Sequence, residues 1–327
     1  MKKIIYSCAG EGRGHVTAVI AISQFLIDKL EIVFVAPPSV SSLLREQFPN
    51  NKVYDVPGLA FPLTKGRINI PKTIIYSAGI LFGRARTVHQ MKEIIIKEKI
   101  DTVICDFEPY TAYASTELGV PLFHINHPGI VLERVSFRPE ILLAKLGAFL
   151  IMGSYGQKTA FYSFFNGQLG PIIRKEILEL TPEDGNHFLV YLNPHMKKYF
   201  LRIAKNFPQY QFKFFPNPQE DYLEALRTCK AVIAPGGHQT ISEAIVLKKP
   251  ILAYPIPSQY EQILNVKMLN YSGRGFGGNP KKLKKSFIEF LNWLPGFPYP
   301  QKGHNTFRLH DDTSTAVKEI LDFIENH

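Results

Sequence analysis

The sequence predicts an α/β protein made of two doubly wound, Rossmann-like domains. Short β-branched runs alternate with helical patterns from the first residues, then the alternation stops between residues 128 and 170 and resumes at residue 188. Strands that alternate with helices form parallel βαβ units with right-handed crossovers. The length of 327 residues also fits two domains of about 150 residues each. We therefore expect domains 1–165 and 166–327 to face each other across a cleft, because open α/β sheets bind ligands beside the carboxyl ends of their strands.

The first half contains five short apolar runs with the continuous hydrophobicity of strands that are buried on both faces. These runs are residues 3–9, 31–36, 52–57, 101–107 and 120–126. Segments with helical spacing of apolar residues lie between them. These segments are residues 17–29, 39–47, 84–99 and 109–118. The apolar, aromatic and basic stretch from 128 to 170 shows no clean period and ends at Gly170 and Pro171, which predict a hinge.

The second half repeats the pattern. The expected strands are residues 188–192, 211–216, 231–237 and 250–256. The expected helices are residues 195–206, 219–228, 239–247 and 260–270. Two further segments, 281–294 and 315–324, carry apolar residues at helical spacing, which predicts packing faces with solvated lysines. We expect the last helix to pack back on the first domain.

Composition limits the classes of partner and the compartment. The net charge of +10 favours an anionic partner, either nucleic acid, a phosphate-bearing substrate or an anionic membrane surface. No nucleic-acid-binding motif accompanies the charge, so we expect no nucleic-acid partner. The three cysteines lack metal-ligand spacing and lie in or beside apolar segments, which favours buried thiols in the cytoplasm. The apolar part of the opening residues is too short for a signal peptide, and no run is long enough for a membrane span.

The glycine-rich turn SCAGEGRGHV follows the first predicted strand. A dinucleotide fingerprint that starts at Gly10 and Gly12 needs a third glycine at position 15, where this chain has His15. A phosphate loop needs a lysine and a hydroxyl residue, and neither follows the glycines. The turn therefore predicts close backbone approach to a ligand, with an imidazole at the start of a helix as a candidate general base. The alternative is that His15 only begins a helix beside a structural turn.

Asp106 ends another predicted strand of the same sheet. A carboxylate at that place can orient His15 and stabilise its protonated form. The alternative is that Asp106 caps the helix that starts near Pro109. Together, His15 and Asp106 predict a catalytic dyad.

The stretch APGGHQTISE predicts an anion site in the second half. A strand ends at Pro235, Gly236 and Gly237, and a helix begins near His238. The first amides of a helix have no partner within it and favour anions. We therefore expect four backbone N–H groups and one hydroxyl to bind a diphosphate, and these belong to Gly237, His238, Gln239 and Thr240, with the hydroxyl from Thr240.

Carboxylates further along are candidates for binding sugar hydroxyls. Glu243 lies one helical turn inside this helix, where it can accept hydrogen bonds from both hydroxyls of a ribose. Glu261 and Gln262 open the next helix and are placed to reach hydroxyls of a transferred sugar. The alternative is an ordinary helix cap with a surface pair of glutamates.

The segment from Ala234 to Asn265 resembles the donor-binding segment of GT-B glycosyltransferases. The similarity is to the lipid-II-forming N-acetylglucosaminyltransferase group (family 28) and to the UDP-glycosyltransferases. The matching positions are Gly237, Thr240, Glu243, Pro250, Glu261 and Gln262. The opening turn is similar to the glycine-rich N-terminal loop of the same group, and DFEPYTAYASTELGVP resembles the segment that supplies the aspartate partner of the catalytic histidine. We add Gly12, Gly14, Arg174 and Gly236 to the donor-binding set.

Two positions depart from the pattern of these families. Pro235 stands where many UDP-glycosyltransferases have a phosphate-binding histidine, and His238 follows three residues later. Two additional residues separate Pro255 from Glu261 and Gln262.

The resemblance implies transfer of a hexose or N-acetylhexosamine, with inversion and without a metal or other cofactor, from a nucleotide sugar that is UDP-linked. His15 would remove the proton of an acceptor hydroxyl, and Asp106 would hold its imidazole. The acceptor is a lipid, a polymer or a small molecule, which fits cell-envelope, glycolipid or polysaccharide synthesis. Alternatives are a UDP-sugar 2-epimerase and a non-catalytic nucleotide-sugar-binding subunit.

Two further features leave alternatives open. The aromatic segments near 70–86 and 141–165 either hold a cytoplasmic enzyme against the anionic inner face of the membrane or are ordinary core. His124 and His127 have no third ligand nearby, so we expect residues that line the cleft or form hydrogen bonds rather than a metal site.

Overall fold

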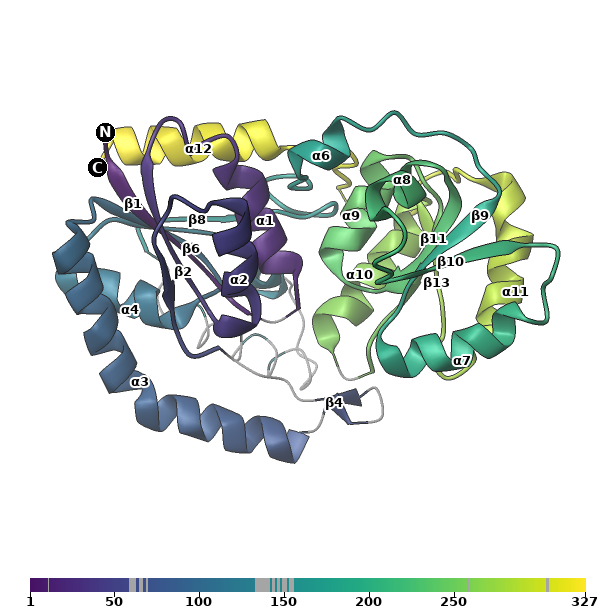
Figure 1. The fold of residues 1–327 in the computed structure, drawn as a ribbon, viewed down its shortest axis with the longest axis horizontal. Helices are drawn as coiled ribbons and strands as arrows, with labels where there is room; N and C mark the ends of the chain where they lie inside the picture. Colours follow the sequence, from purple (N-terminus) through teal and green to yellow (C-terminus); the bar gives the residue numbers. More distant parts are fainter. Residues whose placement is uncertain are drawn as a thin grey trace.

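The computed structural model of the chain has two α/β domains side by side (Figure 1). It describes residues 1–10, 12–58, 63–64, 67–68, 70–132, 142, 145, 148, 152, 156–257, 259–303 and 306–327, and for residues 63–83 it describes backbone elements only. Both large sheets consist of parallel strands flanked by helices. The predicted fold class is confirmed.

The first domain is built on a six-stranded sheet with the order β3-β2-β1-β6-β7-β8. Its strands are β1 (Lys3–Cys8), β2 (Glu31–Ala36), β3 (Val53–Asp55), β6 (Thr102–Asp106), β7 (Leu122–Asn126) and β8 (Lys158–Phe161). Its helices are α1 (Gly14–Ser23), α2 (Pro38–Gln47), α3 (Ile70–Glu98) and α4 (Pro109–Leu118), with a 3₁₀ turn η1 (Pro128–Val131). A small antiparallel pair, β4 (Leu63–Thr64) and β5 (Arg67–Ile68), precedes α3.

Besides the short elements β4, β5 and η1, which were not predicted, β8 and α3 differ from the sequence-based expectation. β8 was not predicted, because KTAF is four residues long and has no alternation; it is defined by its parallel pairing with β7. α3 begins at Ile70, well before the predicted start at residue 84. The earlier start was not predicted, because the sequence of the first half of the helix is apolar and aromatic without a helical period.

The second domain has a five-stranded sheet with the order β10-β9-β11-β12-β13. Its strands are β9 (His187–Tyr191), β10 (Gln211–Phe215), β11 (Cys229–Pro235), β12 (Ile251–Tyr254) and β13 (Gly275–Gly277). Its helices are α6 (Lys175–Leu178), α7 (Pro194–Ala204), α8 (Tyr222–Arg227), α9 (His238–Val246), α10 (Tyr260–Ser272) and α11 (Leu283–Trp293), followed by η2 (Leu294–Gly296). Three short elements of this domain, β13, α6 and η2, were not predicted from the sequence.

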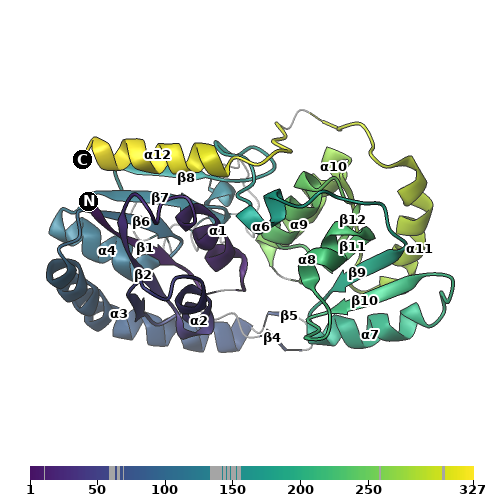
Figure 2. The ribbon, with the colours of Figure 1, turned by 45° about the horizontal axis from the view of Figure 1, so that its top comes forward.

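The last helix, α12 (Thr313–Glu325), lies against the first domain rather than the second (Figures 1 and 2). Its apolar side belongs to the core cluster that also contains Ile4 and Val16. The ring centroids of Phe323 and Phe123 are 5.3 Å apart, and Lys158 of β8 forms an ion pair with Glu319. The chain therefore crosses between the domains twice.

The described residues agree with the expectation that the three cysteines are buried. Cys8, Cys105 and Cys229 are buried free thiols. In the part of the chain that the structure describes, no helix combines the length and the apolar character needed to cross a membrane.

Glu98, at the end of α3, joins three elements of the first domain through partly buried hydrogen bonds. Its carboxylate accepts from Lys52 (2.8 Å), Tyr54 (2.6 Å) and Lys3 (3.0 Å). These partners, Lys52 foremost, lower the pKa of Glu98 from 4.5 to about 2. A carboxylate with a lowered pKa in the folded state stabilises the fold above its unfolded pKa and loses that contribution as the pH falls through its folded pKa.

We therefore expect Glu98→Gln to lower the free energy of unfolding by about 1–3 kcal/mol at pH 7. The difference from wild type should shrink as the pH falls from about 5 toward 3. Urea unfolding at several pH values measures both. Glu31→Gln is the control, because Glu31 pairs with Lys3 from an exposed position. A Glu98→Gln effect that does not depend on pH would contradict the assignment.

Candidate active site

A cavity of 840 Å³ lies between the two domains. Its walls include residues that follow the carboxyl ends of strands from both sheets, among them His15, His127 and Pro235. Apart from Asp106 and Gly236, every predicted site residue lines it. These are Gly12, Gly14, His15, Arg174, Gly237, His238, Gln239, Thr240, Glu243, Glu261 and Gln262.

The predicted dyad is present in the first domain. β1 and β6 are neighbours, with Cys8 opposite Asp106, so the turn after β1 passes over the end of β6. His15 Nδ1 lies 2.7 Å from Asp106 Oδ1, and the Asp106 side chain is fully buried. Gly12 has a φ of +67°, a conformation that glycine adopts without strain, and α1 begins two residues later. The turn thus presents the imidazole to the cavity with its carboxylate partner behind it.

Asp106 is not the cap of α4. Glu108 caps this helix, because its carboxylate accepts hydrogen bonds from the backbone N–H groups of Tyr110 (2.7 Å) and Thr111 (3.0 Å). Phe107, between the two acids, has a φ of 62° and stacks on His15, with ring centroids 5.9 Å apart and planes 7° apart. Both oxygens of Asp106 therefore remain for side chains at the cavity.

The start of α9 has the geometry that the predicted anion site requires. The N-cap residue is Gly237, which has no side chain to cap the helix, and the first helical hydrogen bond runs from Ile241 N–H to the Gly237 carbonyl. The N–H groups before Ile241 have no partner within the helix and carry its positive dipole end. A Cβ atom on Gly237 would meet no atom within 4 Å, whereas one on Gly236 would lie 2.7 Å from Val266. Gly237 thus leaves room for a ligand, and Gly236 permits close packing behind it.

The ring of His238 does not take part in the anion site at the start of α9. It is buried, its Nε2 accepts a hydrogen bond from the backbone N–H of Phe164 (3.2 Å), and it stacks on His127 with centroids 3.7 Å apart. Burial, followed by the nearby His127, lowers the pKa of His238 well below its usual value. The His238 ring is neutral, and its acceptor nitrogen Nε2 is already bonded to Phe164. It therefore does not replace the phosphate-binding histidine of other families, whose position is occupied here by Pro235. His238 offers the cavity its backbone N–H.

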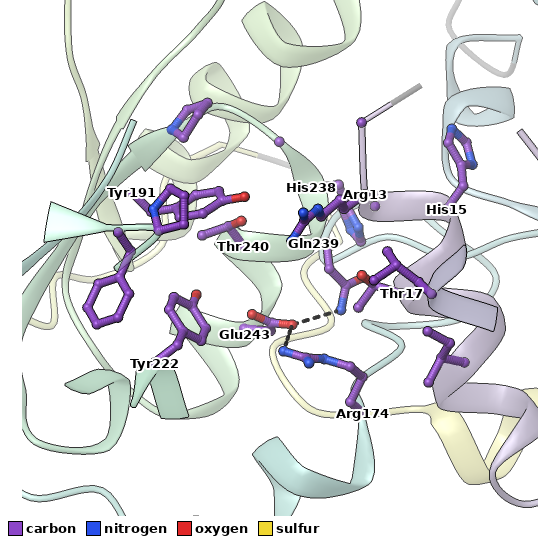
Figure 3. A pocket seen from close by; sticks show the side chains of 18 of the residues that line it. Arg13, His15, Thr17, Arg174, Tyr191, Tyr222, His238, Gln239, Thr240 and Glu243 are labelled. Carbon is purple, nitrogen blue, oxygen red and sulfur yellow. Dashed lines mark hydrogen bonds and ion pairs between the residues drawn. The ribbon is translucent and has the colours of Figure 1, made fainter. Parts of the chain in front are cut away.

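Glu243 lies one turn inside α9 and is 4% exposed. Its Oε1 atom is 3.3 Å from Gln239 Nε2 and 3.4 Å from Arg174 Nη2 (Figure 3). Burial raises the pKa of Glu243, and Arg174 and Gln239 act in the opposite direction. Arg174, which follows Gly170 and Pro171, therefore supports the carboxylate from outside the helix.

Glu261 and Gln262 begin α10 on the same side of the cavity. Gln262 Oε1 accepts from the backbone N–H of Ile256 (3.0 Å), which leaves its amide nitrogen for a ligand. Glu261 Oε1 accepts from Asn265 Nδ2 (3.0 Å) and lies 3.6 Å from His127 Nε2. His127 thus lies in the cleft as expected. Among the described residues, no group of three or more His, Cys, Asp or Glu side chains could hold a metal ion.

The sequence reasoning missed the aromatic wall of the cavity and one residue beside the dyad. Tyr191 and Phe215, at the ends of β9 and β10, and Tyr222 of α8 form the wall, with the Tyr222 ring 6.2 Å from Tyr191 and 5.4 Å from Phe215. Tyr162 donates its hydroxyl to Asp106 Oδ2. Aromatic residues inside apolar segments are typical of a hydrophobic core, so the sequence does not indicate the aromatic wall. Tyr162 lies in the stretch without a helical or strand period, so the sequence does not indicate its contact with Asp106 either.

Comparisons with known proteins agree with this geometry. A family model described as Glycosyl transferase family 1 matches residues 2–295. An uncharacterised glycosyltransferase of Methanopyrus kandleri is 28% identical over 308 residues, which cover 81% of this chain and 90% of that protein. An uncharacterised glycosyltransferase of Methanosarcina mazei is 27% identical over 200 residues, which cover 59% of this chain and 48% of that protein. That match spans about half the length of the Methanosarcina mazei relative.

Solved structures with the same architecture include both groups that the sequence resembles. MurG of Acinetobacter baumannii superposes with a TM-score of 0.58 at 15% identity, covering 100% of both chains. A UDP-glucosyltransferase of Polygonum tinctorium gives 0.61 at 11% identity, covering 99% and 98%. A Streptomyces glycosyltransferase solved with thymidine diphosphate gives 0.58 at 13% identity, covering 98% and 100%. These identities establish the fold, and the family model spans both domains. The chain therefore belongs to glycosyl transferase family 1 and has the GT-B fold of its structural neighbours.

Proposed function

We propose that this glycosyltransferase moves a hexose or N-acetylhexosamine from a UDP-sugar to an acceptor hydroxyl with inversion at the anomeric carbon. One observation carries the proposal: the His15–Asp106 pair and the uncapped start of α9 open on the same cavity from opposite domains. A base on one side and an anion site on the other are the two groups that displacement of a diphosphate by a hydroxyl requires.

The donor is placed by the second domain. The diphosphate lies on the amides at the start of α9, with the Thr240 hydroxyl beside them. Glu243, one turn further, accepts hydrogen bonds from the ribose hydroxyls, and the wall containing Tyr191 and Tyr222 takes the base. Glu261 and the amide of Gln262 face the transferred sugar. Complexes of two neighbours with UDP and thymidine diphosphate support a nucleoside diphosphate as the ligand.

The first domain supplies the base. Asp106 occupies His15 Nδ1, so Nε2 is the nitrogen that accepts the proton of the acceptor hydroxyl. As this proton leaves, the hydroxyl oxygen bonds to the anomeric carbon from the side opposite the diphosphate, and the bond from that carbon to the diphosphate oxygen breaks. Asp106 stabilises the imidazolium that forms. The amides of α9 stabilise the negative charge on the leaving UDP. No metal or cofactor takes part in this scheme.

Product analysis separates the three candidate functions. With donor alone, a UDP-sugar 2-epimerase converts one UDP-sugar to another, whereas a transferase releases UDP, slowly to water and faster with an acceptor. A nucleotide-sugar-binding subunit does neither. We expect UDP release from one member of a panel of UDP-sugars, with no isomerised donor. Isomerised donor without UDP release would instead establish the epimerase.

The acceptor is proposed to be a lipid, polymer or small molecule with a free hydroxyl, in envelope, glycolipid or polysaccharide synthesis. The excess of positive charge supports peripheral contact of a cytoplasmic enzyme with an anionic inner membrane face. The side chains of residues 70–83, and eleven of the residues 141–155, lie outside the described part of the chain. Flotation with phosphatidylglycerol vesicles tests this contact, and absence of co-flotation would remove it.

A further inference from the structure

Tyr162 lies directly after β8, where the chain leaves the first sheet for the second domain. It is 3% exposed, and its backbone N–H donates to the Asn126 carbonyl (3.2 Å). Its hydroxyl donates to Asp106 Oδ2 at 3.0 Å, while Asp106 Oδ1 lies 2.7 Å from His15 Nδ1. The two oxygens of this buried carboxylate are therefore held from opposite sides, one by Tyr162 and one by His15.

Two hydrogen bonds fix the plane of the Asp106 carboxylate, which a single hydrogen bond leaves free to rotate. The torsion that turns a carboxylate about its Cβ–Cγ bond has a broad energy minimum, so one partner does not define the plane. Burial, followed by the charge of Asp106, raises the pKa of Tyr162 well above its usual value, so its hydroxyl keeps its proton and remains a donor. With Tyr162 on Oδ2, the plane of Asp106 is set, and Oδ1 meets His15 in one orientation.

Tyr162 also contacts the donor side of the cavity. Its carbonyl oxygen lies 3.0 Å from His127 Nδ1, and its ring centroid is 5.7 Å from that of His238, the first residue of α9. His127 stacks on His238. One residue, through its side chain and its backbone carbonyl, therefore connects the dyad of the first domain to the start of the donor helix.

We propose that Tyr162 is a positioning residue, which fixes the plane of the Asp106 carboxylate. It thereby holds the His15 imidazole in one orientation relative to the start of α9. The inference rests on the proposed function, in which His15 is the base. Because the Tyr162 hydroxyl is engaged by Asp106, its removal acts on the rate of transfer rather than on donor binding.

Tyr162→Phe tests this role. With the UDP-sugar that gives the fastest UDP release, kcat should fall by about tenfold, while the KM for the donor and the Kd for UDP stay within about twofold. The melting temperature reports that the variant is folded. The matched control is Tyr6→Phe: Tyr6 lies on β1, is 1% exposed, and its hydroxyl has no hydrogen-bond partner among the described residues. This control should leave kcat unchanged.

A double-mutant cycle with Asp106→Asn separates the possible failures. If Tyr162 acts through Asp106, adding Tyr162→Phe to Asp106→Asn slows the enzyme no further. Two results would overturn the positioning role while the proposed function stands. In the first, Asp106→Asn lowers kcat but Tyr162→Phe alone has the same kcat as Tyr6→Phe. In the second, the losses in kcat of Tyr162→Phe and Asp106→Asn multiply in the double variant. If Asp106→Asn keeps wild-type turnover, the proposed dyad fails, and the role of Tyr162 fails with it.

Discussion

A His15→Ala variant should release UDP from the donor about 10²–10⁴-fold more slowly than wild type, because it lacks the group that removes the acceptor proton. Its affinity for UDP should stay close to that of wild type, since His15 is not among the expected UDP contacts. Steady-state kinetics of acceptor-dependent UDP release, with a UDP titration in parallel, measures both quantities.

Two further variants make this result specific. His15→Gln keeps polarity at the site but cannot take a proton at neutral pH, so it should be as slow as the alanine variant. His89→Ala removes an exposed histidine of α3 and should leave kcat unchanged. A His15→Ala enzyme with full turnover would remove His15 as the base, whatever its UDP affinity.

A Glu243→Gln variant should bind UDP about 10–100-fold more weakly, because a neutral amide replaces a carboxylate that accepts charge-assisted hydrogen bonds from the ribose. The side chain keeps its size and stays beside Gln239 and Arg174, so the fold is retained. At saturating donor the loss in kcat should be smaller than the loss in affinity. Calorimetric titration with UDP gives the Kd directly.

Changing the ribose of the nucleotide tests whether Glu243 binds the ribose hydroxyls. With 2′-deoxy-UDP, one of the two proposed ribose contacts is absent, so the difference between wild type and Glu243→Gln should shrink. Glu179→Gln, at an exposed glutamate after α6, should bind UDP like wild type. Equal UDP affinity of wild type and Glu243→Gln would show that the carboxylate does not bind the ribose.

The dyad could be predicted from the sequence because both residues follow strand ends. His15 and Asp106 are more than ninety positions apart, but a doubly wound sheet places β1 beside β6, and the register of Cys8 with Asp106 follows from that order. The start of α9 was predictable for a similar reason: two glycines after a strand leave amides that only a ligand or a cap can satisfy.

Other parts depend on contacts that no local pattern encodes. The ring of His238 could have faced the anion, and only the amide of Phe164, which the chain brings from the first domain, shows that it does not. Arg174 carries no motif, and its role as partner of Glu243 becomes visible only in the folded chain. β8 and Tyr162 come from a stretch without period, where tertiary pairing rather than sequence alternation fixes the structure.

Both proposals require the cavity between the domains to bind a nucleoside diphosphate. Thermal unfolding with a panel of nucleotides and nucleotide sugars measures this binding. UDP and one UDP-sugar, at about 100 times their Kd, should add about 2.7 kcal/mol to the stability of the bound state and raise the melting temperature by several degrees. NAD should have no effect, and Glu243→Gln should abolish most of the UDP shift at the same concentration. Stabilisation by NAD but not by UDP, or no response to any nucleotide, would contradict the account.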